Sequence, residues 1–207
     1  MIAALRRNWP VAIAIAHLFL AVLYGIVNPP YEANDETGHF GFVNHVVATK
    51  TLPNALSEEN RALLDQSHQP PLYYVIQAVV TGWIDRSDGR TPTPNVFAFD
   101  GTNRRGMRLL LRQPDDGVPW QGTILALHAA RLVSAALGAL SIYLVARIAL
   151  LVLPDSPATA ALATALAAFN PLAVFISSMV NNDVMVTLVG TFTAWLLLRI
   201  TLSVSAP

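Results

Sequence analysis

The chain has 207 residues, of which 54% are hydrophobic and only 13% are charged. Because soluble domains carry roughly 25% charged residues, we expect much of this surface to face lipid. Thirteen basic residues balance thirteen acidic ones, which excludes the basic excess typical of nucleic-acid binders. The sequence contains no cysteine, which excludes disulfides, thiolate zinc sites and thiol nucleophiles.

Four apolar stretches are predicted to cross a membrane, because a bilayer core of about 30 Å needs about 20 apolar residues in a helix. The first covers residues 11–27 and follows Arg6 and Arg7. A cleaved signal peptide is the rival interpretation, but this stretch ends in Asn-Pro-Pro without a small-residue cleavage pattern. The other three stretches cover residues 123–153, 158–179 and 184–202.

A shorter apolar stretch, residues 72–84, decides the topology. If it lies along the membrane surface, Arg6, Arg7, Arg147 and Arg199 all fall on one face of the membrane; if it crosses, Arg147 and Arg199 move to the opposite face. The bias of Lys and Arg toward the cytoplasm favours the surface helix and a cytoplasmic N-terminus.

The expected fold is therefore an all-α, polytopic transmembrane helical bundle with about four spans. A long extracytoplasmic loop carries short membrane-surface helices. In this division, residues 1–27 form the N-terminal transmembrane helix, residues 28–121 the extracytoplasmic loop, and residues 122–207 the remaining three transmembrane helices.

The first polar cluster follows the first span, on a predicted helix over residues 35–49. Asp35 and His39 are one helical turn apart, with Glu36 beside them. A carboxylate here could take a proton from an incoming hydroxyl, and Asp35 with His39 could hold a divalent cation. In the alternative interpretation, Asn34 or Asp35 caps the helix and Glu36 complements its positive end.

The second polar cluster leads into the predicted surface helix. Pro70 and Pro71 can start a helix without an amide donor and hold the preceding His68 in an extended conformation that aims its side chain. Tyr73 and Tyr74 suit the lipid headgroup layer, so the alternative is an interfacial anchor without a chemical role.

The third cluster lies inside the span at residues 123–153, where His128 and Arg131 share a helix face. An arginine in a span is costly and usually faces a bundle interior, a partner or a polar pathway. Its guanidinium suits a phosphate or pyrophosphate at headgroup depth. The alternative is an ion pair with an acid of the outer loop, such as Asp35.

The fourth cluster, Asn181, Asn182 and Asp183, interrupts two apolar stretches. With the surface helix in place, it lies outside, on the same face as Asp35. A tight polar turn in which Asp183 caps the next span is the alternative. The four clusters reach one outer interface only if residues 72–84 do not cross the membrane.

The ordered set of motifs resembles the GT-C superfamily of integral-membrane glycosyltransferases, which includes the protein O-mannosyltransferases and aminoarabinose transferase. The matching residues are Asp35-Glu36 with His39, His68-Gln69-Pro70-Pro71-Leu72-Tyr73-Tyr74, Arg131-Leu132-Val133-Ser134, and Asn170-Pro171 followed by Asn182-Asp183. GT-C enzymes usually have more spans, so the resemblance covers their N-terminal module.

The resemblance implies that sugar moves from a polyprenyl-phosphate carrier to an acceptor outside the cytoplasm, by an inverting displacement at the bacterial inner membrane. Asp35 and Glu36 would be catalytic, with Asp35 as the base, and a divalent metal ion would bind Asp35 and His39. Substrate contacts would come from His68, Tyr73, His128, Arg131, Asn182 and Asp183.

Two other functions remain open. One is a non-catalytic membrane subunit that keeps the GT-C-like fold and packs against a partner membrane subunit. The other is a transporter, in which His17, His128 and Arg131 would line a path, although no span carries a chain of ionisable residues. The expected partners are lipid-linked sugar and membrane lipid, not nucleic acid.

Overall fold

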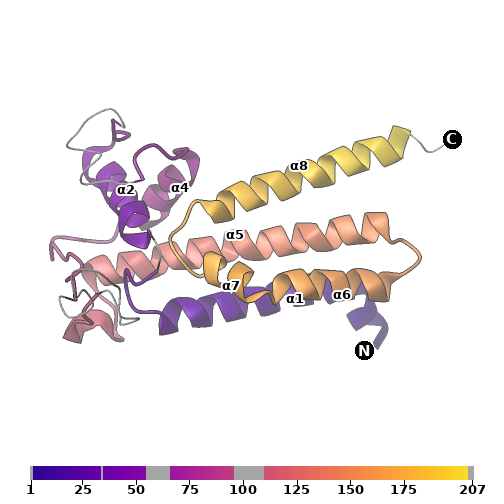
Figure 1. Cartoon of the computed structure of the whole chain (residues 1–207), viewed down its shortest axis with the longest axis horizontal. Coiled ribbons are helices and arrows are strands. Elements are labelled where there is room, and N and C mark those ends of the chain that lie inside the picture. The colour runs from indigo at the N-terminus through magenta and orange to yellow at the C-terminus, as the bar shows by residue number, and fades with distance from the viewer. Residues whose placement is uncertain (1, 34, 55–65, 96–109, 205–207) are drawn as a thin grey trace, which may run out of the picture. The chain divides into compact units, whose positions relative to one another are not determined.

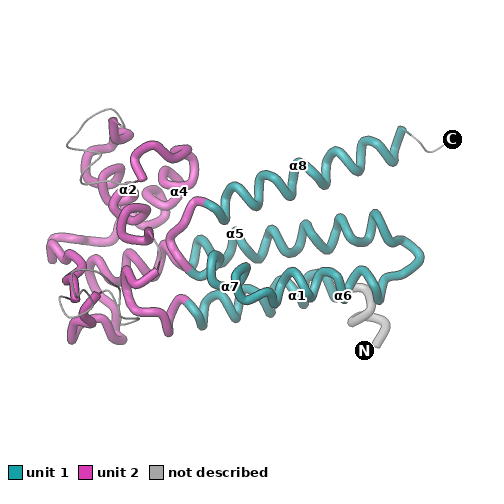
Figure 2. The backbone as a smooth tube through the Cα atoms, viewed as in Figure 1, with its two compact units in different colours: residues 1–24, 132–178, 183–207 teal, residues 25–131, 179–182 magenta. Residues whose placement is uncertain are grey.

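The computed structural model describes residues 2–33, 35–54, 66–95 and 110–204, with side chains from residue 8 onward. These residues are folded as helices and connecting loops, with one isolated β-bridge between Pro94 and Leu110 (Figure 1). The chain divides into two compact units (Figure 2). The span unit comprises residues 1–24, 132–178 and 183–207, and the loop unit comprises residues 25–131 and 179–182.

Three helices are long and apolar enough to cross a membrane: α1 (Ile2–Val27), α5 (Gly122–Val152) and α8 (Asp183–Val204). Two shorter helices, α6 (Pro157–Ala168) and α7 (Pro171–Ser177), pass the same test together as one span bent by 60°. The described residues thus provide three candidate spans, or up to four with the bent pair. This confirms the predicted all-α class and the presence of helices long and apolar enough to cross a membrane.

The stretch at residues 158–179, predicted as one span, is broken at Asn170-Pro171. Pro171 has no N–H for the helix ladder and restricts Asn170 to an extended backbone, with φ −61° and ψ 123°. The Asn170 Oδ1 then accepts a hydrogen bond of 2.9 Å from Leu172 N and caps α7. In a continuous helix that N–H would bond the Ala168 carbonyl, so the break leaves this oxygen needing another donor.

His17 supplies that donor within the span unit. It lies on α1 with 1% of its surface exposed, and its Nδ1 is 2.7 Å from the Ala168 carbonyl oxygen. Its Nε2 is 3.0 Å from Ser177 Oγ on α7. Polar contacts of this kind hold helices together in lipid, and this one joins α1 to both halves of the bent span.

The loop unit is built around α2 (Glu36–Thr49) and α4 (Leu72–Thr81), which pack on each other. The Phe42 and Tyr74 rings stack with centroids 3.9 Å apart. Gln77 of α4 donates a 3.1 Å hydrogen bond from Nε2 to the Ala130 carbonyl of α5. With 10 residues, α4 is roughly 15 Å long, about half the thickness of a bilayer core.

The start of α5 is capped by an acid from a distant segment. Asp88 accepts hydrogen bonds from Thr123 N at 2.9 Å and from Thr123 Oγ1. Although partial burial opposes the shift, these hydrogen bonds hold the pKa of Asp88 below its usual range. A Cβ on Gly122 would lie 2.2 Å from Asp88 Oδ2, and Gly122 has φ +51°, so glycine is required for this cap.

Gly138 of α5 allows Ser177 to approach closely, because a Cβ at position 138 would lie 2.7 Å from Ser177 Cβ. Gly190 of α8 has no such neighbour, since a Cβ there would meet nothing within 4 Å. We expect Gly138→Ala to destabilise the protein by about 1–3 kcal/mol through overpacking. The matched Gly190→Ala should be neutral or stabilising by up to about 1 kcal/mol. Thermal unfolding in detergent measures both changes, and equal melting temperatures would contradict the predicted contact.

Candidate functional site

A buried ion pair joins Glu36, the first residue of α2, to Arg131 of α5. Glu36 has 0% and Arg131 2% of its surface exposed. The pair is bidentate: Arg131 Nε donates to Glu36 Oε1 at 2.8 Å, and Nη2 donates to Oε2 at 2.5 Å. Two parallel charge-assisted hydrogen bonds are the strongest geometry available to these groups.

The remaining donors of Arg131 bind the end of α1. Nη1 donates to the carbonyl oxygens of Gly25 and Asn28, each at 2.7 Å, and Nη2 donates to that of Pro29 at 2.9 Å. The last carbonyls of a helix have no partner inside the helix and carry partial negative charge. Arg131 therefore caps α1, and all five guanidinium N–H groups are engaged.

Glu36 is engaged as fully as its partner. Besides Arg131, its Oε2 accepts from Tyr31 N and its Oε1 accepts from Val180 N, each at 3.1 Å. Val180 lies in the link between α7 and α8. One carboxylate thus holds the end of the α1 segment, α2, α5 and the α7–α8 link in one place.

Two residues near this pair have left-handed backbones. Tyr31 has φ 64° and Asp35 has φ 59°. Such conformations cost of order 1–3 kcal/mol for residues other than glycine and cluster at functional sites. In this left-handed conformation, the backbone N–H of Tyr31 donates a hydrogen bond to the Glu36 carboxylate. Burial raises the pKa of the Tyr31 hydroxyl, and the nearby Glu36 carboxylate adds to that rise.

Asp35 differs from Glu36 in being exposed. It occupies the N-cap position of α2, but in the described part of the chain its side chain makes no capping hydrogen bond. The capping alternative therefore does not account for this side chain, and Asn34, the other residue considered for the cap, lies outside the described residues. Asp35 is an accessible carboxylate next to a fixed one.

His39 is buried, with 3% of its surface exposed. Its Nδ1 lies 2.7 Å from the hydroxyl oxygen of Tyr74. Among the residues that the structure describes, no group of three or more His, Asp and Glu side chains comes together to hold a metal ion. A divalent ion at Asp35 and His39 stays a prediction, and the ring of His39 has a second role in packing α2 on α4.

The second and fourth polar clusters meet in the loop unit. The Tyr73 hydroxyl accepts a 3.0 Å hydrogen bond from Asn181 N, and Asn182 Nδ2 donates to Gln69 Oε1 at 3.1 Å. Tyr73 and Tyr74 have 1% and 0% of their surface exposed, so they pack inside the protein and do not form the interfacial anchor considered from the sequence. His68 is exposed.

Two further predicted substrate contacts have other partners. His128, in the loop unit, is buried and stacks on Trp120, with ring centroids 3.8 Å apart. Asp183 begins α8 in the span unit and, with His17 and Ser177, lines a cavity of about 580 Å³. The buried members of the predicted site that the loop unit contains are Glu36, His39, Tyr73, His128, Arg131 and Asn182.

The phosphate contact at Arg131 stays a prediction, and it would compete with bonds that Arg131 already makes. Its donors are all taken by Glu36 and by the end of α1, so a phosphate could bind only after existing bonds break. The alternative considered from the sequence, an ion pair with an acid of the outer loop, is present in the structure, with Glu36 in place of Asp35.

Sequence reasoning missed the residues that fix the ends of helices. Arg86 donates from Nη2 to the carbonyl oxygen of Thr81 at 3.0 Å, at the end of α4, and lies over the Phe40 ring. Asp88 caps α5 from 35 positions away in sequence. An Asp shortly after α4 gives no local sign that it caps a distant helix. A cation just beyond the end of a helix, such as Arg86 after α4, does give a local sign of capping.

Comparison of the chain with family models, curated proteins and solved structures finds no match. The arrangement of the residues therefore carries the functional proposal.

Removing Arg131 should leave a buried, unpaired carboxylate. We expect Arg131→Met to destabilise the protein by about 3–5 kcal/mol. The matched Arg147→Met, on the same helix but exposed, should change stability by no more than about 1 kcal/mol. Chemical unfolding in detergent monitored by circular dichroism compares the two. Equal losses would mean that the Glu36–Arg131 pair does not hold the loop unit together.

Proposed function

We propose that this chain is a membrane glycosyltransferase, or the N-terminal part of one, that uses a polyprenyl-phosphate-linked sugar. The observation that carries the proposal is Asp35: an exposed carboxylate in a left-handed backbone, directly before a residue fixed by the buried ion pair. A catalytic base needs access to its substrate and a fixed position.

The proposed topology places the N-terminus in the cytoplasm of a bacterial cell and residues 28–121 outside the inner membrane, with α4 along the surface. Arg131 near the start of α5 binds the end of α1, which supports a loop that leaves and re-enters the membrane on one face. A single crossing by α4 would separate these two ends. Its length of roughly 15 Å also favours a surface position.

In the proposed reaction, an acceptor hydroxyl attacks the anomeric carbon of the lipid-linked sugar. A new bond forms between the acceptor oxygen and that carbon, while the bond between the carbon and the phosphate oxygen breaks. Asp35 takes the hydroxyl proton, and polyprenyl phosphate leaves with the bonding electrons. The configuration at the carbon is inverted because attack and departure occur on opposite sides.

The leaving phosphate gains charge in this reaction and needs positive charge nearby. Because Arg131 is engaged by Glu36, its role in the proposal is to fix the segment that carries Asp35. His68, exposed just before α4, is the proposed phosphate contact. No step of the proposed reaction depends on a metal ion.

Replacing the base should abolish transfer without unfolding the protein. In the full-length gene product, we expect Asp35→Asn to lower transfer about 10²–10⁴-fold. The measurement is release of polyprenyl phosphate from a panel of hexose- and pentose-loaded undecaprenyl phosphates. Asp155→Asn, in the exposed turn between α5 and α6, is the matched control and should leave the rate unchanged. If Asp35→Asn retains full transfer while folded, Asp35 is not the base.

The alternative, a non-catalytic membrane subunit, is favoured by one observation. Only 6% of the apolar stretch of α8 is buried inside the described part of the chain. A span so little covered by its own chain suits packing against further spans or a partner subunit. This function predicts that the unaltered protein releases no polyprenyl phosphate from any substrate of the panel and is extracted from native membranes only within a larger complex.

A further inference from the structure

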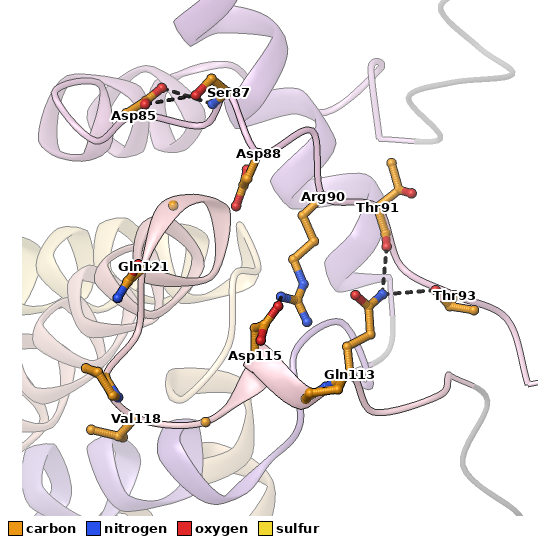
Figure 3. Close-up of a pocket in the computed structure, with 14 residues that line it drawn as sticks. Asp85, Ser87, Asp88, Arg90, Thr91, Thr93, Gln113, Asp115, Val118 and Gln121 are labelled. Carbon is orange, nitrogen blue, oxygen red and sulfur yellow. Dashed lines mark hydrogen bonds and ion pairs between the residues drawn. The ribbon is translucent and has the colours of Figure 1, made fainter.

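The loop unit contains a polar cleft whose lining includes neither Glu36 nor Arg131. It has a volume of about 840 Å³, within the range of small-molecule sites. Its lining comes from residues 85–93, after α4, and from residues 113–122, which include the 3-10 helix η2 (Pro114–Asp116) and lead into α5. In Figure 3, Asp88, Arg90 and Asp115 lie on one side of this space, and Gln121 and Val118 lie across it.

The polar groups of the cleft are held in place by hydrogen bonds. Gln113 donates from Nε2 to Thr93 Oγ1 at 2.9 Å and to the Thr91 carbonyl at 3.3 Å (Figure 3). The Asp88 carboxylate is fixed on Thr123 at the start of α5. Groups that are fixed before binding lose less entropy when a ligand arrives. Because Thr93 Oγ1 accepts the bond from Gln113, its own proton is left to donate, and Gln121 brings a second amide to the cleft; such groups suit a ligand rich in hydroxyls.

The charge of the cleft is uneven. Arg90 is neutralised by Asp116, which lies 2.5 Å from its Nη2 and has 7% of its surface exposed. Asp115, at 3.9 Å from Arg90 Nη1, is 87% exposed. Asp85 and Asp88 also face the cleft, and hydrogen bonds from Ser87 lower the pKa of Asp85. Among the described residues that line the cleft, Asp85, Asp88 and Asp115 therefore remain in excess over the neutralised Arg90.

We propose that this cleft binds a hydroxyl-rich small molecule that carries an ammonium group, such as an amino sugar. The fixed hydroxyls and amides would bind the ligand's hydroxyls, and the uncompensated carboxylates would attract its positive charge. The backbone around Pro114 and Pro119, with Val118, offers an apolar surface for the carbon–hydrogen face of a ring. The proposal concerns equilibrium binding and holds whether or not the chain transfers sugar.

The cleft adjoins the segment that carries Asp35. Tyr31, whose N–H binds Glu36, lines a second, small pocket together with Arg90 and Gln113 of the cleft wall. Glu32 reaches the same region, because its Oε2 accepts from Leu110 N at 3.2 Å. A ligand in the cleft would thus lie behind the loop that positions Asp35, separated from that loop by a shared wall.

Three probes of similar size test the charge preference: glucosamine, glucose and gluconate. Titration calorimetry of the full chain in nanodiscs at low salt should give the lowest Kd for glucosamine, by about two- to fivefold relative to glucose, because an exposed charge pair contributes up to about 1 kcal/mol. Gluconate should bind most weakly. If glucosamine binds no more tightly than gluconate, or if none of the probes binds, the proposal is wrong.

The variant Asp115→Asn tests whether the ligand binds in this cleft, because it removes one of the carboxylates that line it. The side chain is exposed, so the change should not unfold the protein. We expect the variant to remove the preference for glucosamine over glucose, while Asp155→Asn, far along the chain in another exposed turn, keeps it. The melting temperature shows whether either variant remains folded. A preference that survives in folded Asp115→Asn would place the ammonium group outside this cleft and overturn the assignment.

Discussion

The loop unit depends on the buried pair of Glu36 and Arg131. A buried charge is costly unless it is paired and its remaining hydrogen-bonding groups are satisfied. Here the other guanidinium N–H groups donate to the carbonyl oxygens of Gly25, Asn28 and Pro29. The carboxylate accepts hydrogen bonds from the N–H groups of Tyr31 and Val180. Because each lone pair and proton has one partner, the geometry of the four joined segments is fixed.

This requirement explains the contrast between two adjacent acids. Glu36 has no freedom to move without leaving Arg131 unpaired, whereas Asp35 is exposed at the start of the same helix. Chemistry at a membrane surface needs both properties, a rigid support and a group that can meet substrate. If Asp35 is the base, as proposed, the adjacent pair divides these tasks, and loss of Glu36 would disturb Asp35 through its backbone.

Much of the helical architecture follows from composition, because a span needs a fixed length of apolar residues whatever it packs against. The helix predicted at residues 35–49 is α2, which begins one residue later. Two features were not predicted. The Asn170-Pro171 pair stood out in the sequence, but the apolar residues on both sides of it favoured a single continuous span. The partner of Arg131 could not be chosen among the acids of the outer loop, of which Asp35 was the example, because helical spacing does not reveal a left-handed backbone at φ 59°.

Residue types indicated an ion pair at Arg131, but they could not indicate the backbone contacts that complete the site. Arg131 is held by backbone carbonyls, which every residue carries, and Glu36 by backbone N–H groups. The acid that caps α5 and the arginine that caps α4 act across turns whose path the sequence does not specify. Side-chain chemistry marks which residues are costly to bury, whereas tertiary structure decides which backbone atoms compensate them.

The broken span has an evolutionary consequence. The kink at Pro171 exposes the Ala168 carbonyl, and His17 on a different helix satisfies it. If replacement of the proline straightened the helix, the Ala168 carbonyl would no longer be available as an acceptor for the imidazole. If the imidazole were lost instead, that carbonyl would lack a hydrogen-bond donor inside the helix bundle. Related sequences should therefore show these two positions changing together, with an apolar residue at position 17 wherever position 171 is no longer proline.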